Sequence, residues 1–141
     1  MLIGKYTIET KASQEAIWNI WQNVKNWNTW DLATEYSYIN GPFREGAQGS
    51  WKAKGGPLSP IKVTRVEPLK MSVIEFKLFL ARIVVTHHFY ESRGKTQISE
   101  QIETKGPLGF LFAYLLGRKI KQNLFRGLEA LVKKAEFLSK T

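Results

Sequence analysis

The chain has 141 residues, of which 43% are hydrophobic and 13% aromatic, and its formal net charge is +9. This balance excludes a disordered chain and predicts one packed domain over residues 1–141. The absence of cysteine excludes disulfides, thiolate metal sites and a cysteine nucleophile. We see no signal-peptide pattern near Met1, and the longest apolar run, residues 108–116, is too short to span a bilayer. We therefore expect a soluble, cytoplasmic protein.

The first part of the chain predicts one strand followed by two short helices. Polar and apolar residues alternate over Lys5–Thr10, which is typical of a strand. Ser13 is suited to cap a helix, and apolar residues then recur at helical spacing, at Ile17, Ile20, Trp21 and Val24. A second helical turn carries Trp27, Trp30 and Asp31. This cluster forms either one wall of a pocket or an aromatic corner in which Asp31 caps backbone N–H groups.

The middle of the chain predicts an antiparallel sheet, with six or seven strands when the first one is included. The expected strands are Thr34–Ile39, Gly49–Lys54, Ile61–Glu67, Ser72–Leu80, Ile83–Glu91 and Ile98–Thr104. Alternation points Trp51 and Phe76 inward, whereas the pattern leaves the direction of Tyr36 open. The tip at Leu78–Leu80 exposes apolar groups, which either guard a cavity entrance, touch a membrane or partner, or lie under the last helix.

The hairpin over residues 83–104 has a register that the sequence itself determines. If Arg93-Gly94 is a two-residue turn, then Ser92 pairs with Lys95. Counting back along both strands places Phe89 opposite Ile98, His87 opposite Glu100, and Val85 opposite Ile102. Apart from His87 and Glu100, this face is apolar, so we expect it to point into the protein.

His87 and Glu100 are the two candidates for chemistry, because they are the ionisable residues expected on the inner face. Burying an ion pair costs several kcal/mol per ion unless it is well hydrogen-bonded. Glu100 could hold the tautomer of His87 and make the ring a general base, or the two could anchor the polar end of a ligand. The other interpretation is a mutually satisfied polar pair in the core or at the mouth of a cavity.

The segment Gly106–Lys140 predicts one long helix. Its start, residues 108–116, is apolar on every side, so we expect the sheet to cover it. Further on, the apolar residues form an inward stripe, comprising Ile120, Leu124, Leu128, Leu131, Ala135 and Leu138. A curved antiparallel sheet that closes on one long helix can enclose a cavity, so the chain predicts an α+β ligand-binding fold.

Known catalytic and cofactor motifs are missing from the sequence. There is no glycine-rich nucleotide loop, no GxSxG and no HExxH, so we expect no cofactor and no metal. The adjacent His87 and His88 point to opposite faces of a strand, which makes them a poor metal pair. The basic charge either solubilises the surface or gives a weak peripheral contact with an anionic membrane; we expect no nucleic-acid binding.

Four segments give the chain a family resemblance. These are WxxWD at Trp27–Asp31, GPFREGAQGSWK at Gly41–Lys52, VTRVEP at Val63–Pro68, and GPLxxLxxxLLGRxI at Gly106–Ile120. The chain resembles the START-like, or Bet v 1-like (SRPBCC), superfamily, in its polyketide cyclase/dehydrase and lipid transport branch, over essentially its whole length. The resemblance implies a helix-grip fold, in which a curved antiparallel sheet wraps round the C-terminal helix and leaves a hydrophobic cavity. It assigns no role to His87 or Glu100.

We therefore predict that this single domain binds or transports a small hydrophobic or amphipathic ligand, such as a lipid or polyketide, between the sheet and the last helix. The expected lining is Tyr36, Trp51, Phe76, Leu78, Val85, His87, Phe89, Ile98, Glu100 and Phe112. The alternative is a cyclase- or dehydratase-type enzyme acting on a polyketide-like substrate, with His87 as general base. The ligand itself and the oligomeric state do not follow from the sequence.

Overall fold

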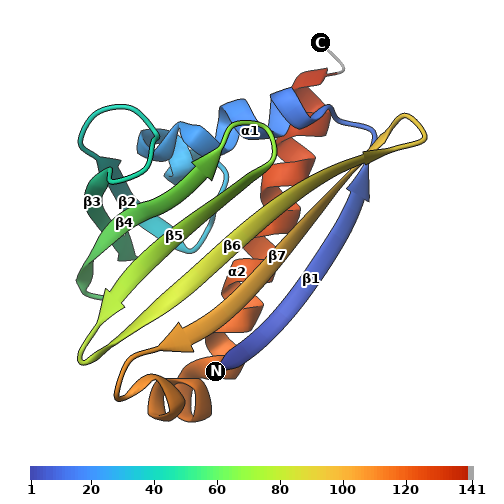
Figure 1. Ribbon diagram of the computed structural model, residues 1–141. Coiled ribbons are helices and arrows are strands. Elements are labelled where there is room, and N and C mark those ends of the chain that lie inside the picture. Colours follow the sequence, from blue (N-terminus) through green and yellow to red (C-terminus); the bar gives the residue numbers. More distant parts are fainter. Residues whose placement is uncertain (140–141) are drawn as a thin grey trace.

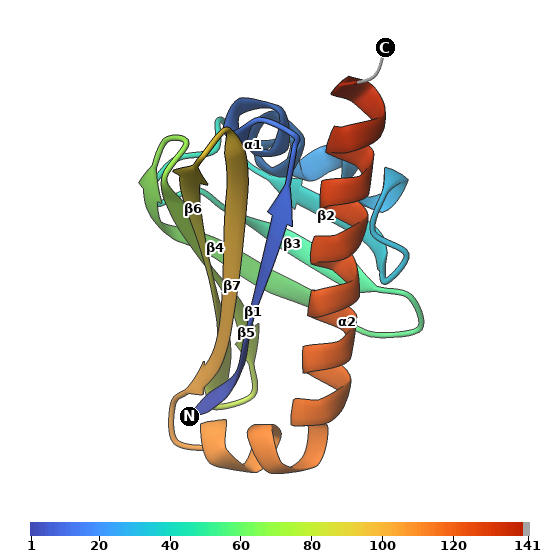
Figure 2. The same cartoon turned by 90° about the vertical axis from the view of Figure 1, so that its right-hand side faces the viewer.

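The computed structural model describes residues 1–139 as an antiparallel sheet, two short helices and one long helix (Figure 1). In chain order the elements are β1 (Leu2–Thr10), α1 (Gln14–Gln22), the 3₁₀ helix η1 (Val24–Thr29), β2 (Thr34–Ile39), β3 (Gln48–Ala53), β4 (Leu58–Glu67), β5 (Met71–Leu78), β6 (Ala81–Ser92), β7 (Lys95–Lys105) and α2 (Gly109–Ser139). The seven strands follow the order β1-β7-β6-β5-β4-β3-β2. The curved sheet faces α2 across its concave side (Figure 2), which confirms the α+β helix-grip fold.

The β6–β7 hairpin has the register that the sequence predicts. Arg93 and Gly94 both adopt positive φ angles, 53° and 75°, as a two-residue type I′ turn requires. Ser92 pairs with Lys95, and the count back along the strands places His87 opposite Glu100. The local chemistry of one turn therefore fixes the position of the two candidate residues.

Helix α1 also begins where its sequence predicts. The Ser13 hydroxyl accepts a hydrogen bond from the backbone N–H of Ala16 at 3.0 Å, which satisfies one free donor of the first turn. The apolar side of the helix faces the sheet through buried Ile17, Trp18 and Trp21. Together with the second half of α2, these residues fill one end of the core.

Helix α2 turns soon after it starts. Figure 2 shows its first part running across the bottom of the sheet before the helix turns and follows the concave side. The chain reaches this position through Gly106, which has a φ of 98° and lies so close to Ala81 that a Cβ would approach the Ala81 Cα to 2.9 Å. The Thr104 hydroxyl donates to the carbonyl of Gly109 at 2.8 Å, which holds the first turn against β7.

The expectation that the sheet covers the apolar start of α2 is wrong. Phe110, Leu111, Tyr114, Leu115 and Leu116 are all exposed. The physical reason is the turn in α2, because the first part of the helix projects past the end of the sheet and only the later part lies over it (Figure 2). Helical periodicity gave no indication of this change of direction.

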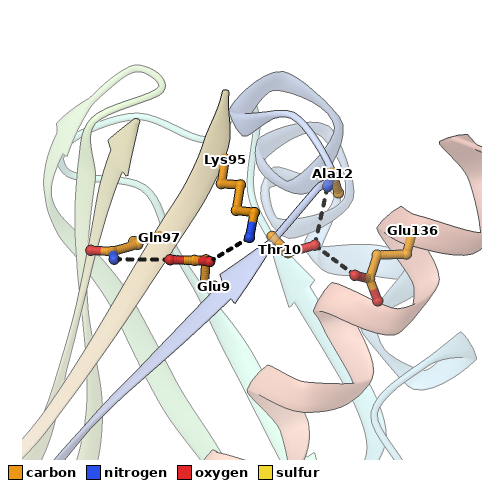
Figure 3. A network of polar contacts seen from close by, with 6 residues as sticks. All are labelled: Glu9, Thr10, Ala12, Lys95, Gln97 and Glu136. Carbon is orange, nitrogen blue, oxygen red and sulfur yellow. Dashed lines mark hydrogen bonds and ion pairs between the residues drawn. The ribbon is translucent and has the colours of Figure 1, made fainter. Parts of the chain in front are cut away.

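The far end of α2 is tied to β1 through Thr10 (Figure 3). The Thr10 hydroxyl donates to the Glu136 carboxylate at 2.8 Å and accepts the backbone N–H of Ala12 at 3.1 Å. The predicted inward stripe is correct for Leu128, Leu131 and Ala135, which are buried, and for Ile120 and Leu124, which are partly buried. It is wrong for Leu138, which is exposed because α2 extends beyond the sheet (Figure 2). Lys140, the predicted end of the helix, lies outside the described residues.

Candidate functional site

A cavity of about 140 Å³ lies between the concave side of the sheet and α2. Aromatic and aliphatic side chains make up most of its wall. The sheet and the segment before β2 contribute Trp27, Trp30, Asp31, Ala33, Trp51, Phe76, Ile83, His87 and Glu100; the helices contribute Trp21, Ile120, Asn123, Leu124, Gly127, Leu128 and Leu131. An apolar wall with a few polar groups is typical of a small-molecule site.

His87 and Glu100 form a buried pair in this wall. They face each other on neighbouring strands, and the His87 Nε2 lies 2.5 Å from the Glu100 Oε2. Each residue is only 2% exposed. The edge of the Trp21 ring lies against the imidazole, with 4.4 Å between ring centroids, so the ring orientation is fixed by packing as well as by the hydrogen bond.

The pair is not mutually satisfied. Within the described part of the chain, the His87 Nδ1 and the Glu100 Oε1 are buried without a hydrogen-bond partner, and the indole N–H of Trp30 is a third such atom. All three residues line the cavity. Leaving a buried polar atom unpaired costs about 1–3 kcal/mol, so three such atoms in residues around one cavity make this region stand out in the described part of the chain.

The other tryptophans of the cavity wall do have partners. The Trp21 indole N–H donates to the Ser72 hydroxyl at 3.1 Å, and that of Trp27 donates to the Trp21 carbonyl at 2.8 Å. The Trp51 indole N–H donates to the Thr34 hydroxyl at 2.9 Å. Trp30 therefore differs from its neighbours, since its donor has no such role in holding the wall together.

Asp31 fixes the corner between η1 and β2. Its carboxylate accepts hydrogen bonds from the backbone N–H of Ala33 at 3.0 Å and from the Thr34 hydroxyl at 2.8 Å. Helix α2 approaches this corner at Gly127, where a Cβ would lie 3.6 Å from the Asp31 carboxylate. Trp27, Trp30 and Asp31 thus serve both roles left open by the sequence: they form a capped aromatic corner, and that corner is a wall of the cavity.

The neutral and charged forms of the pair offer a ligand different hydrogen bonds. With Nε2 protonated and bonded to Glu100, the Nδ1 of a neutral His87 accepts a hydrogen bond or takes up a proton. A protonated His87 donates from Nδ1 instead. The Glu100 Oε1 accepts in either case when the carboxylate is ionised, and the Trp30 indole donates. The site therefore suits a molecule that carries both a hydroxyl and an acceptor oxygen.

Four of the ten residues predicted to line a ligand site do line this cavity: Trp51, Phe76, His87 and Glu100. Val85, Phe89 and Ile98 lie in the core instead, and the ring of Trp18 packs on Phe89 with 5.6 Å between centroids. All three share the inner face with His87: Trp18 of α1 covers Phe89, whereas Val85 is buried between the cavity residues Ile83 and His87. Alternation identified the face correctly and could not indicate which part of it is filled.

The remaining three predicted residues, Leu78, Phe112 and Tyr36, lie away from the cavity wall. Leu78 is the last residue of β5, and Phe112 lies in the first turn of α2. Tyr36 is 48% exposed, because an irregularity in the β2–β3 pairing between Thr34 and Tyr36 interrupts the alternation of faces.

Sequence reasoning missed the helix side of the cavity. Asn123 and Gly127 line it together with Ile120 and Leu124, which had been assigned only to an inward stripe. The stripe was a usable signal for these residues. Which part of it faces open space depends on where the helix crosses the sheet.

Two other features are absent from the part of the chain that the structure describes. Among residues 1–139 no group of three or more acidic, histidine or cysteine side chains is placed to hold a metal ion. In the same part of the chain, no helix is both long and apolar enough to cross a membrane.

Comparison with known proteins identifies the fold. No family model and no curated protein matches the sequence. Among solved structures, the di-domain ARO/CYC protein StfQ from the steffimycin biosynthetic pathway is similar with a TM-score of 0.81 at 9% identity, over 100% of this chain and 53% of StfQ. DynU16 from the dynemicin biosynthetic locus gives 0.70 at 14%, over 94% of this chain and 46% of that one. The chain thus spans about half the length of both proteins.

A neighbour of nearly the same size shows the same architecture. The hypothetical protein jhp0584 from Helicobacter pylori has a TM-score of 0.75 at 9% identity, over 93% of this chain and 86% of that one. The chain therefore has the helix-grip fold that its sequence resemblance predicted. At these identities the similarity extends to the fold alone.

Proposed function

We propose that the protein binds a small amphipathic organic molecule in the cavity between the sheet and α2. The observation that carries this proposal is the set of three buried, unpartnered polar atoms on His87, Glu100 and Trp30, all in residues that line one apolar cavity. Apolar contact would supply affinity, at about 25 cal/mol per Å² buried. The three polar atoms would orient the ligand.

The size of the cavity limits the ligand. An apolar cavity of about 150 Å³ holds one benzene molecule, and the cavity here is about 140 Å³. The preferred ligand of this conformation is therefore one ring with polar substituents. A lipid chain or a polyketide is larger than this volume, so it would have to extend beyond the cavity or displace α2, which is held by the Thr10–Glu136 hydrogen bond and by the one from the Tyr6 hydroxyl to Glu129.

A matched pair of probes tests the proposal, namely phenol and toluene, which differ by a hydroxyl in place of a methyl group. Titration is followed by ¹H–¹⁵N NMR of the indole N–H signals of the five tryptophans. We expect the signals of cavity residues to move, Trp30 most, whereas Trp18 lies outside the wall and serves as an internal control. Phenol should bind about tenfold more tightly than toluene, because it alone can hydrogen-bond the buried polar atoms.

Gly127→Leu provides the matched variant, since it places a side chain in the cavity wall. Gly117→Leu is the control, because Gly117 is a buried glycine of the same helix that does not line the cavity, and the only atom near a Cβ there is the Ile3 Cγ2, at 4.0 Å. The proposal predicts that Gly127→Leu abolishes probe binding and Gly117→Leu preserves it. Equal binding by both variants, or none by the parent protein, would show that the cavity is not the site.

The natural ligand is a separate question, which native mass spectrometry of freshly purified protein addresses. Solvent extraction and identification of any bound compound would give its class. A compound with one ring and at least one hydroxyl or carbonyl oxygen fits the cavity as it stands. A long-chain lipid would have to extend beyond the cavity or displace part of its wall.

The enzyme hypothesis has one observation in its favour, which is that Glu100 orients His87 and leaves its Nδ1 without a partner. This is the arrangement a general base needs. StfQ, whose name describes an ARO/CYC protein, has the same fold. A His87→Ala variant separates the two functions: a binding protein would retain affinity for an apolar probe, whereas an enzyme would lose about a hundredfold or more of its turnover while still binding substrate.

A further inference from the structure

One end of the molecule exposes a group of large apolar side chains, here called the apolar pole. It consists of Phe79 and Leu80 in the β5–β6 turn and of Phe110, Leu111, Tyr114 and Leu115 at the start of α2. Tyr114 is 84% exposed and Phe79 is 74% exposed. Both views of the fold place the β5–β6 turn and the start of α2 at the same end (Figures 1 and 2).

The exposure of the apolar pole is built into the fold. The backbone N–H of Leu108 donates to the Leu80 carbonyl at 3.0 Å, which ties α2 to the β5–β6 turn. Leu80 adopts a φ of 53°, in the left-handed region that disfavours residues with a side chain. The structure thus holds two apolar segments together on the outside. Contiguous exposed apolar groups of this kind mark interaction surfaces.

The charged residues that flank the apolar start of α2 along the chain have one sign. Lys105 precedes α2, and Arg118, Lys119 and Lys121 follow the apolar start of the helix, with no acidic residue anywhere in 104–128. Within residues 1–139, none of these four cations takes part in a salt bridge. The surface therefore combines exposed apolar side chains with positive charges that form no salt bridge.

We infer that the apolar pole docks the protein on an anionic lipid bilayer. Apolar and aromatic side chains would enter the boundary between headgroups and acyl chains, while the neighbouring cations contact lipid phosphates. A second copy of this chain is a poorer occupant, because a symmetric contact through the pole would bring the same cations together in a protein of net charge +9. This inference concerns the outer surface and does not depend on a ligand in the cavity.

Vesicle flotation with the full chain tests the inference. We expect binding to phosphatidylcholine vesicles that contain about 30 mol% phosphatidylglycerol, and at least tenfold weaker binding to pure phosphatidylcholine. Salt at about 0.5 M should weaken the anionic binding, since it screens the contact between cations and headgroups. Equal partition onto both vesicles, or none onto either, would overturn the inference.

Two phenylalanines of α2 give a matched pair of variants. Phe110 is 63% exposed in the apolar pole, and Phe137 is 68% exposed near the other end of the helix. We expect Phe110→Ser to weaken binding to the anionic vesicles about tenfold, and Phe137→Ser to change it less than twofold. Both substitutions are on the surface, so both variants should fold. Equal losses would mean that the pole is not the contact.

The contribution of positive charge to vesicle binding is tested by a separate pair of variants. Replacing Arg118 and Lys119 by Gln should remove most of the preference for anionic vesicles, whereas Lys133→Gln, at an exposed site in the second half of α2, should leave that preference intact. Light scattering of the same samples measures oligomeric state. A dimer that Phe110→Ser dissociates, without vesicle binding, would overturn the inference in favour of a second copy as the occupant.

Discussion

Replacing His87 and Glu100 singly and together tests whether this pair is retained for binding or for stability. The substitutions are His87→Leu and Glu100→Met, which roughly conserve volume and remove every polar atom of the pair. The Trp21 ring, which packs against the imidazole, would contact leucine instead. Because both residues are only 2% exposed, each single change leaves its partner in the protein interior without its hydrogen bond.

The expected changes in unfolding free energy follow from the polar group that each substitution leaves buried. His87→Leu leaves a carboxylate with no partner, which typically costs about 3–5 kcal/mol of unfolding free energy. Glu100→Met leaves a neutral imidazole with an unmade hydrogen bond, which costs about 1–3 kcal/mol. The double substitution leaves no polar atom of the pair behind, and the Trp30 indole N–H is unpaired with or without it. It should therefore be roughly neutral or stabilising, by up to about 4 kcal/mol.

Urea denaturation at 25 °C of the four proteins gives these free energies, provided that the m-value stays constant. The cycle should show a coupling of at least about 4 kcal/mol between the two sites. If the double variant loses as much unfolding free energy as the two single variants lose together, the two side chains are not buried and coupled in the way described. The double variant should also lose the preference for phenol over toluene. If it keeps that preference, the pair does not recognise the ligand.

Two other predictions concern the scaffold around the site. Gly127→Ala should stabilise the protein by about 1 kcal/mol and raise its melting temperature by about 3 °C, because alanine favours the helix more than glycine does. The added Cβ would lie 3.6 Å from the Asp31 carboxylate, which is an ordinary van der Waals contact. A lower melting temperature would contradict this prediction. Hydrogen bonds from Lys95 and Gln97 lower the pKa of Glu9 (Figure 3). The ionised Glu9 side chain therefore stabilises the fold at a pH above the ordinary glutamate pKa of about 4.3, and this stabilisation is lost as the pH falls through the lower pKa of the folded protein. The difference in melting temperature between the parent and Glu9→Gln should therefore be seen at pH 7 and disappear once the pH has fallen below the lowered pKa of Glu9. A difference that does not change with pH would refute the assignment.

The sequence by itself determined the local features of this fold. The Ser13 cap starts α1, and the Arg93-Gly94 turn sets the β6–β7 register, so that His87 faces Glu100. These features follow from interactions within one turn of helix or between two strands joined by a tight turn. Such interactions depend on residue type and spacing, which can be read without knowing the rest of the structure.

The tertiary structure alone decided which of these residues surround open space. Phe89 shares a face with His87, yet Trp18 of α1 packs on it, and Val85 on the same face is buried in the core. An irregularity in the β2–β3 pairing leaves Tyr36 exposed. The apolar start of α2 lies outside because the helix turns past the end of the sheet. Periodicity specifies the face of an element on which a side chain lies. What covers that face is set by packing between segments far apart in the chain, and no local pattern encodes it.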